Sequence, residues 1–392
     1  MIALAGVAAW SSAASARITF TFDYSLDAAA NNFFNSSTSN GLAARAALEA
    51  AADVFSDRLI DTLSAITPSG SNTWTATGRS PITGSTTNFT VQNVPANTLY
   101  VYAAGRVEGG STLAVGGYGG YSASGFQPWF DTLKGRGNTD ALLASPTDFA
   151  NWGGSISFNT SSTWNYSVTN NPVAGQNDFY SVAMHELGHL LGFGTAPSFK
   201  TTYTSNLQFT GPKAKALNGG NDVPLNNTGG HLAEGFQSQL YAGGPNQEAA
   251  MDPTILVGTR KKFTLMDWAG LDDLGWTLAR PGDANADSNV NFNDLLVLAA
   301  NYGTSNQTWS EGDFNYDGAI NFNDLLLLAS AYGSTSPLGE VSSAVASGAM
   351  SESFASQWAL AQSMVPEPAA ASVVLSLTTL ACRRPRRAGT AG

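Results

Sequence analysis

Three histidines are present among the 392 residues, and the spacing of two of them constrains the fold most strongly. His185 and His189 stand four residues apart in an apolar stretch that follows Asp178. On a helix this spacing places both imidazoles on one face, one turn apart. Asp178 is suited to cap the first turn of such a helix. The sequence therefore predicts a helix with a His-Glu-x-x-His motif, in which Glu186 follows the first histidine.

This motif is typical of a zinc site. Neutral imidazoles are good zinc ligands, and Glu186 would lie beside a zinc-bound water. Zinc lowers the pKa of bound water to about 7, so that Glu186 can take its proton and pass it to the leaving amine. We therefore expect His185 and His189 to bind Zn²⁺ and Glu186 to act as the catalytic base.

A catalytic zinc site needs a third protein ligand. His231 is the remaining histidine, and Glu234 and Glu248 are the alternatives, either of which would give a His-His-Glu site. Gly192 follows the motif at a position where the chain can turn sharply and bring a later ligand to the metal. We favour His231 as the third ligand.

The stretch 185–192 resembles the metzincin signature, whose third histidine usually lies three residues beyond the glycine. That position is occupied by Thr195, a poor zinc ligand. The later order of His231, Met251 and a D-L-G-W-like sequence at 273–276 resembles the leishmanolysin-like branch, in which the third ligand is displaced downstream. Leishmanolysins are rich in disulfides, whereas this chain has a single cysteine.

The resemblance covers about 178–276. It implies a zinc metalloendopeptidase of the metzincin type, in which His185, His189 and His231 bind zinc and Met251 is the Met-turn residue beneath the metal. It also implies a polypeptide substrate that lies along the zinc cleft and pairs with the edge of a sheet, for which 152–158 is the candidate strand.

Hydrophobic periodicity predicts an α+β domain over 17–280, with a mixed sheet, a long helix and the helix of the histidine motif. Strands are expected at 17–24, 73–77, 88–94, 98–104 and 152–158, and the long amphipathic helix at 42–63. Because 109–125 is rich in Gly, Ser and Tyr, we expect a surface loop there.

A second domain is predicted at 281–334 from a duplicated pattern that starts at Gly282 and recurs 30 residues later, at Gly312. In each copy, Asp or Asn stands at loop positions 1, 3, 5, 9 and 12, which is the spacing that wraps Ca²⁺. Position 7 contributes its backbone carbonyl, and an apolar helix follows each loop. The predicted calcium ligands are Asp283, Asn285, Asp287, Asn289, Asn291 and Asp294 in the first loop, and Asp313, Asn315, Asp317, Ala319, Asn321 and Asp324 in the second.

The paired loops and helices resemble a dockerin module, which is a small all-α domain of EF-hand-type repeats. This resemblance implies that Ca²⁺ is bound and that a cohesin-like protein is a possible partner.

Both ends of the chain look like targeting segments. Residues 1–16 contain a short apolar run and an A-x-A-like site, as in a signal peptide. Residues 335–364 are rich in Ser and Ala and are expected to be a linker. Residues 365–392 combine a Val-Pro-Glu-Pro stretch, an apolar run and four arginines, and resemble a PEP-CTERM sorting tail. That resemblance implies recognition by an exosortase-type enzyme and a place in the bacterial cell envelope or outside the cell.

The net charge of the chain bears on which classes of macromolecule it can bind. The chain has 18 basic and 29 acidic residues, for a net charge of −11. An acidic surface of this kind disfavours binding to nucleic acid.

These features favour an exported zinc-dependent endopeptidase that hydrolyses peptide bonds through a zinc-bound water activated by Glu186. The alternative is a calcium-binding surface or matrix protein whose zinc site is structural or vestigial. The presence of Glu186 favours the enzyme, because a purely structural zinc has no use for this carboxylate.

Overall fold

The computed structural model describes residues 17–333 and 338–365, which form two compact units. The boundary between the units falls after Arg280, except that Asn285–Asn289 is grouped with the first unit. The expected signal peptide at 1–16 and all but the first residue of the expected sorting tail at 365–392 lie outside the described residues.

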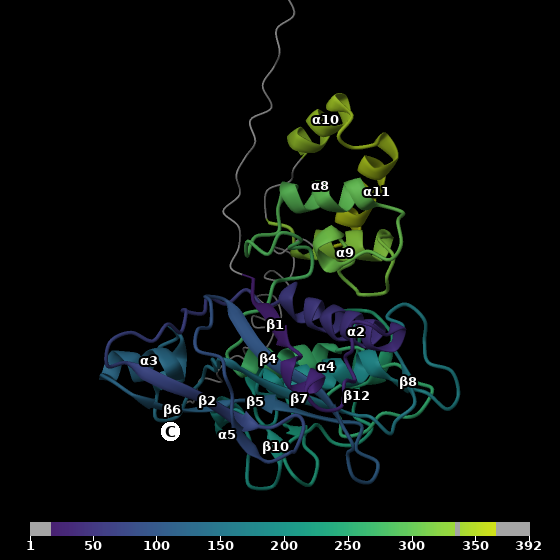
Figure 1. Cartoon of the computed structure of the whole chain (residues 1–392). Coiled ribbons are helices and arrows are strands. Elements are labelled where there is room, and N and C mark those ends of the chain that lie inside the picture. Colours follow the sequence, from purple (N-terminus) through teal and green to yellow (C-terminus); the bar gives the residue numbers. More distant parts are fainter. Residues whose placement is uncertain (1–16, 334–337, 366–392) are drawn as a thin grey trace, which may run out of the picture. The chain divides into compact units, whose positions relative to one another are not determined.

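A four-stranded sheet forms the centre of the first unit (Figure 1). Its strands lie in the order β1 (Thr19–Asp23), β4 (Thr98–Arg106), β7 (Gly153–Asn159) and β5 (Ala114–Tyr118). The first three strands are parallel, and β5 runs antiparallel to β7. The strands expected at 17–24, 98–104 and 152–158 are therefore confirmed, and the sheet is mixed.

Two helices cover one face of this sheet. They are α2 (Ser39–Ser56) and α4 (Phe179–Leu190), which pack against each other while α2 contacts β1 and α4 contacts β5 and β7. The long helix expected at 42–63 is confirmed, but it ends at Ser56, and Leu59 instead forms a β-bridge with Leu278. Fully buried side chains of α2, β4 and α4 share one apolar core, among them Phe55, Val101 and Leu187.

The other face of the sheet carries a second core. Residues of β4 alternate between the two faces, so Val101 packs toward the helices whereas Tyr102 belongs to the second core with Trp74 and Trp152. This core also receives a three-stranded antiparallel sheet in the order β3 (Thr86–Asn88), β2 (Thr73–Arg79) and β6 (Gly120–Ser124). The strand expected at 73–77 is thus confirmed, but only Asn88 of the strand expected at 88–94 is in a strand.

The expectation of a surface loop over 109–125 was wrong, because this segment contains both β5 and β6. Two of its glycines, Gly116 and Gly119, allow close packing. A Cβ atom on Gly116 would lie 2.7 Å from the carbonyl oxygen of Glu186, and one on Gly119 would lie 2.0 Å from the Trp152 ring. Glycine-rich composition therefore marks a strand that lies unusually close to its neighbours.

Shorter elements complete the first unit. They are the helices α1 (Ser25–Ala28), α3 (Gln127–Gly135), α5 (Pro197–Thr201), α6 (Pro212–Leu217) and α7 (Leu265–Asp273), the 3₁₀ turn Asp140–Leu142, and the paired strands β8 (Trp164–Asn165) with β9 (Asn177–Asp178), β10 (Gln208–Phe209) with β11 (Val223–Pro224), and β12 (Gln237–Gln239) with β13 (Asn246–Glu248).

The second unit consists of helices and loops, as expected. The two repeats supply α8 (Phe292–Asn301) and α9 (Phe322–Ala331), each preceded by its loop, with a 3₁₀ turn at Trp309–Glu311 between them. Asn291 and Asn321 cap the two helices in the same way, each forming a capping box with Asp294 or Asp324.

The expectation of a linker at 335–364 was wrong. Instead of an extended segment, the chain forms α10 (Leu338–Ser347) and α11 (Glu352–Met364), and α11 lies against α9 (Figure 1). Trp358 on α11 is 1% exposed, and its ring centroid lies 5.1 Å from that of Tyr332. The Ser- and Ala-rich composition hid the widely spaced aromatic residues that dock this helix.

Across the part of the chain that the structure describes, no helix is long and apolar enough to cross a membrane.

Candidate metal centre

The helix of the histidine motif, α4, is fixed at its first turn. Asp178 is the N-cap residue, and its carboxylate accepts a hydrogen bond from the Ser181 N–H at 3.2 Å, as the sequence predicts. The same carboxylate forms a two-pronged ion pair with Arg260, with N–O distances of 2.8 and 2.9 Å. A buried, bidentate arginine pair of this kind holds the helix start in one orientation.

Beyond α4 the chain turns at two glycines. Gly192 has a φ of +100°, which is the turn expected at this residue. At Gly194, a Cβ atom would lie 2.0 Å from the carbonyl oxygen of Gly230. The bare backbone of Gly194 therefore allows the loop that carries His231 to approach the end of α4.

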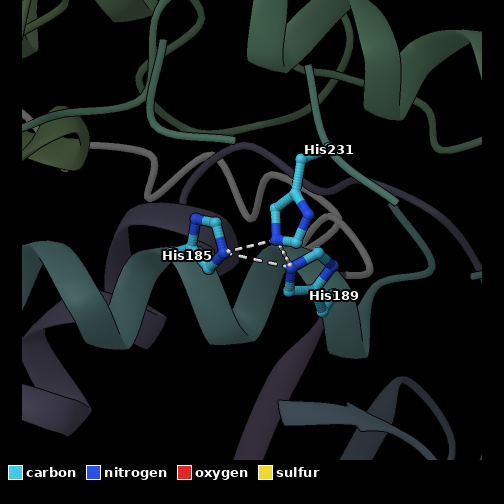
Figure 2. A group of neighbouring side chains, drawn as sticks. All are labelled: His185, His189 and His231. Carbon is cyan, nitrogen blue, oxygen red and sulfur yellow. Dashed lines mark hydrogen bonds between the residues drawn. The ribbon is translucent and has the colours of Figure 1, made fainter. Parts of the chain in front are cut away.

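The three histidine side chains converge at this point (Figure 2). Nε2 of His189 lies 3.0 Å from Nε2 of His185 and 3.0 Å from Nε2 of His231, and the third separation, between His185 and His231, is 3.2 Å. The two histidines of the helix and the distant one thus present the same ring atom to a common centre.

The opposite ring nitrogens decide the protonation of two of these side chains. Nδ1 of His185 lies 2.7 Å from the carbonyl oxygen of Ala250, and Nδ1 of His189 lies 2.8 Å from that of Phe193. A carbonyl oxygen only accepts hydrogen bonds, so both Nδ1 atoms carry the proton and both Nε2 atoms present a lone pair. Burial also lowers the pKa of all three imidazoles, that of His231 to about 4, which keeps them neutral.

Converging lone pairs repel one another unless a cation lies between them. Tetrahedral zinc with Zn–N bonds of about 2.0–2.1 Å holds its nitrogen ligands about 3.3 Å apart. The observed Nε2 separations of 3.0 to 3.2 Å are close to this value. The donor set therefore fits zinc, with three imidazoles and room for a further ligand.

Met251 lies beneath this cluster. A Cβ atom on Gly188, between the two histidines of α4, would lie 2.5 Å from the Met251 sulfur. Met251 is fully buried, and its carbonyl oxygen accepts a hydrogen bond from the N–H of Leu232, next to His231. The sulfur thus packs against α4 between the two histidines, and the Met-turn role of Met251 remains a prediction.

Asp267 holds this methionine in place and was missed in the sequence. It is fully buried, and its two oxygens accept hydrogen bonds from the N–H groups of Ala250 and Met251, both at 2.9 Å. It also forms the capping box of α7 with Thr264. The Thr-x-x-Asp spacing was the available signal, because this pattern marks a helix start and therefore a carboxylate aimed at backbone N–H groups.

Glu186 lines the same cleft as the three histidines and is 6% exposed. Burial raises the pKa of its carboxyl to about 8, and a hydrogen bond from the N–H of Gly116 on β5 opposes this shift. The carboxyl group therefore lies between the metal-binding helix and the edge strand of the sheet.

The cleft itself has a volume of about 620 Å³. One wall is the segment that leads into β5, and the other is formed by the loops around His231 and after Met251. A cleft of this size is typical of an enzyme site.

The strand at 152–158 is not the edge that we expected to pair with substrate. It is β7, whose two sides are occupied by β4 and β5. The edge strand is β5. The residues that flank it, Leu113 and Gly119, bond to Asn159 and Gly153 at the ends of β7. The alternation therefore places the backbone groups of Ala114, Gly116 and Tyr118 on the free side of β5, and the first two of these residues line the cleft.

The rival ligands lie elsewhere. Glu248 pairs with Lys261 at 2.9 Å, and Glu234 accepts a hydrogen bond from the hydroxyl of Thr254. Thr195 lines the cleft, but its hydroxyl donates to the carbonyl oxygen of His189 at 3.3 Å. Neither glutamate is in the group formed by the histidines.

Three aspartate side chains of the second calcium loop lie close together. Oxygen atoms of Asp313, Asp317 and Asp324 lie within 4.8 Å of one another. The N–H groups of Asp317 and Gly318 donate to Asp313 at 3.1 and 2.9 Å, and Gly318 has the positive φ of +85° that a sharp turn at position 6 requires. This is the oxygen-rich, tightly wound arrangement that Ca²⁺ prefers.

The first loop has the same turn at position 6, where Ser288 has a φ of +71°. Among the described residues, no comparable group of three metal-binding side chains includes Asp283, Asp287 or Asp294. The twelve calcium ligands named from the sequence remain a prediction for both loops.

Two family models match the chain. The model described as Matrixin matches residues 126–218, and the one described as Dockerin type I domain matches residues 281–331. The first segment contains His185, Glu186 and His189 but ends before His231. No curated protein and no solved structure gives a significant match.

The first match indicates a zinc metalloendopeptidase domain of the metzincin type, and the second indicates a dockerin domain, so the metal ions that they imply are Zn²⁺ and Ca²⁺. Peptidases act on protein substrates, and dockerin domains bind cohesins.

Proposed function

We propose that the cleft around His185, His189 and His231 hydrolyses internal peptide bonds, and that these three Nε2 atoms hold the zinc. The observation that carries the proposal is the convergence of the Nε2 atoms at 3.0 to 3.2 Å, with the Nδ1 protons of His185 and His189 held by carbonyl oxygens. A displaced third histidine, with Met251 beneath the site, also fits the leishmanolysin-like branch of the metzincins.

Zinc, when bound here, supplies a Lewis acid that polarises the peptide carbonyl group and lowers the pKa of water towards about 7. Glu186 is the general base and then the general acid. A carboxyl group whose pKa is close to the working pH can accept a proton from the attacking water and return it to the leaving amine. The pKa of Glu186, raised by burial to about 8, suits this exchange.

The edge strand β5 positions the substrate. On its free side, the backbone groups of Ala114 and Tyr118 and the carbonyl oxygen of Gly116 offer an extended peptide the hydrogen bonds of one more strand. Because the N–H of Gly116 donates to Glu186, the same strand positions both the catalytic carboxylate and the substrate backbone.

We further propose that the protein is exported and acts in the bacterial cell envelope or outside the cell. Dockerin domains are typically extracellular. The signal-like segment 1–16 and the PEP-CTERM-like tail 365–392, with an exosortase-type enzyme as its partner, support the same location.

The test is Glu186→Gln in the zinc-loaded full chain. Zinc content should stay at the wild-type level, because the carboxylate is not a ligand, while cleavage of a fluorogenic peptide should fall at least about 100-fold. Glu234→Gln is the matched control, since Glu234 is exposed and should leave both quantities unchanged. Cleavage that survives Glu186→Gln would overturn the mechanism, and loss of zinc in Glu234→Gln would overturn the ligand set.

A further inference from the structure

The helices of the two repeats end in the same way. Tyr302 is the C-cap residue of α8 and Tyr332 is that of α9, and their backbone angles are nearly equal, with φ −61° and ψ 130° in the first and φ −60° and ψ 140° in the second. The two tyrosines stand one repeat apart in the sequence, and a glycine follows each of them. They are therefore equivalent residues of the two repeats.

One face of α11 rests on both tyrosines. The ring centroid of Phe354 lies 5.1 Å from that of Tyr302, and Gln357 accepts a hydrogen bond from the hydroxyl of the same tyrosine. The ring centroid of Trp358 lies 5.1 Å from that of Tyr332. Phe354 and Trp358 are 4% and 1% exposed, and their spacing places them on one face of the helix, one turn apart. Adjacent turns of α11 thus contact equivalent residues of different repeats.

The glycine after each tyrosine is bonded to the calcium loop of the other repeat. The N–H of Gly303 donates to the carbonyl oxygen of Ile320 at 2.9 Å, and Ile320 stands at position 8 of the second loop. In the same way, the N–H of Gly333 donates at 3.3 Å to the carbonyl oxygen of Val290, at position 8 of the first loop. The connections are therefore crossed, so that the end of each repeat helix is held by the opposite loop.

The carboxylates at the last position of the loops show the same crossing. Burial raises the pKa of Tyr302, and the negative charge of Asp324, at position 12 of the second loop, adds to this shift. Burial raises the pKa of Tyr332 to about 12, and the negative charges of Glu340 on α10 and of Asp294, at position 12 of the first loop, add to it. Each tyrosine therefore lies near a predicted calcium ligand of the opposite loop.

Docking of α11 and binding of Ca²⁺ thus depend on the same residues. A loop that is wound around the ion fixes its positions 8 and 12, and these positions adjoin the tyrosine that α11 covers. Two binding events that require one arrangement of the same residues favour each other, and the coupling acts equally in both directions.

We propose that α11 is a calcium-coupled clasp. Bound Ca²⁺ holds the helix on the second unit, through Tyr302 for the second loop and through Tyr332 for the first. The docked helix in turn raises the calcium affinity of both loops. Calcium therefore controls the attachment of α11 to the repeats, independently of the peptidase chemistry of the first unit.

The first experiment measures the Ca²⁺ affinity of each loop by calorimetry in the full chain, with the other loop disabled by Asp294→Asn or Asp324→Asn. Phe354→Ala should weaken binding to the second loop about tenfold and change the first by less than about twofold, and Trp358→Ala should do the reverse. Trp358→Phe keeps a ring at this position and should restore the first loop. Leu360→Ala is the matched control, since this residue of α11 is 54% exposed, and it should change neither affinity.

Hydrogen exchange tests the opposite direction with the sequence of α11 unchanged. Removal of Ca²⁺ from the full chain with a chelator should speed amide exchange in residues 352–364 at least about tenfold. With Ca²⁺ present, Asp324→Asn should speed exchange around Phe354 more than around Trp358, and Asp294→Asn should have the opposite effect. This measurement also decides the matter if Phe354→Ala or Trp358→Ala fails to fold.

Equal weakening of both loops by Phe354→Ala and by Trp358→Ala would indicate general destabilisation of the unit and would overturn the clasp. Calcium affinities that neither variant changes would overturn it too, as would exchange in residues 352–364 that does not depend on Ca²⁺. Peptide cleavage is not a readout in either experiment, so a failure of the proposed peptidase function would leave both results interpretable.

Discussion

Each histidine of the metal centre is oriented through its second ring nitrogen. His185 and His189 bond to carbonyl oxygens, which is the outer contact that fixes the tautomer of a metal ligand. His231 differs, since its Nδ1 lies 3.3 Å from the amide nitrogen of Asn226. The amide oxygen of Asn226 is turned the other way, towards the N–H groups of Gly230 and His231 at 3.2 and 3.4 Å.

This contact leads to a prediction for Asn226→Asp. One carboxylate oxygen can still accept the hydrogen bonds from the backbone N–H groups. The other can accept a hydrogen bond from the protonated Nδ1 of His231, which an amide nitrogen cannot do. Zinc should then bind more tightly, by about tenfold, when measured by competition with a chelator. Asn221→Asp, in an exposed turn, is the control for the added negative charge. Zinc affinity that is unchanged or weaker in Asn226→Asp would contradict this account of His231.

At the scale of elements, the site depends on the close approach of β5 to α4. A Cβ atom on Gly116 would meet Glu186 at 2.7 to 3.0 Å, whereas one on Gly117, the next residue of the same strand, would meet nothing within 4 Å. Neither glycine has a positive φ, so the two positions differ in space and not in backbone strain.

Gly116→Ala should therefore push β5 away from the helix and displace Glu186. We expect kcat to fall about tenfold or more, and the free energy of unfolding to fall by about 1–3 kcal/mol. Gly117→Ala should leave kcat close to the wild-type value. Equal effects of the two substitutions on kcat would show that β5 does not position the carboxylate.

The composition of the chain gave the wrong answer for β5 and for α11, and the reason is the same for both. Periodicity reveals elements that bury a regular apolar face, as in β1, β4, β7 and α4. In β5, glycine replaces the apolar side chains, because the strand packs by backbone contact, and in α11 small residues surround a few anchoring rings. Only the tertiary neighbours distinguish such segments from a loop or a linker.

Helix α11 can be tested by comparing two of its residues. Trp358 is 1% exposed and Leu360 is 54% exposed. Trp358→Ala should lower the free energy of unfolding of the second unit by about 3–5 kcal/mol, whereas Leu360→Ala should change it by less than about 0.5 kcal/mol. Calorimetry of the calcium-loaded full chain measures both. If Trp358→Ala changed the free energy of unfolding as little as Leu360→Ala, the segment would be a linker and not a docked helix.

At the scale of the whole molecule, the histidine cluster and the acidic cluster of the second calcium loop belong to two separate compact units. The histidine cluster lies in the first unit, and the Asp313, Asp317 and Asp324 cluster lies in the second. The histidine motif and the duplicated loops could both be found in the sequence, because their ligands have fixed spacings along a helix or a loop. His231 was named as the remaining histidine and from the order of the later motifs, since nothing local shows that Gly194 lets its loop reach α4.

Asp324→Asn tests this separation. Asp324 is buried at position 12 of the second loop, and the loss of its charge should remove one Ca²⁺ per chain in a calorimetric titration. Cleavage of a short peptide should stay within about twofold of wild type, because the catalytic residues all lie in the other unit. Asp294→Asn gives the corresponding measurement for the first loop. A parallel loss of cleavage would show that calcium binding controls the zinc unit.

The central claim is that zinc is held by two histidines of one helix and a third from a distant loop. Anomalous diffraction at the zinc edge from crystals of the zinc-loaded full chain tests it most directly. We predict one peak in the first unit, about 2.0–2.1 Å from Nε2 of His185, His189 and His231. A peak bound by Glu234 or Glu248 in place of His231, or no zinc among these histidines, would contradict the account.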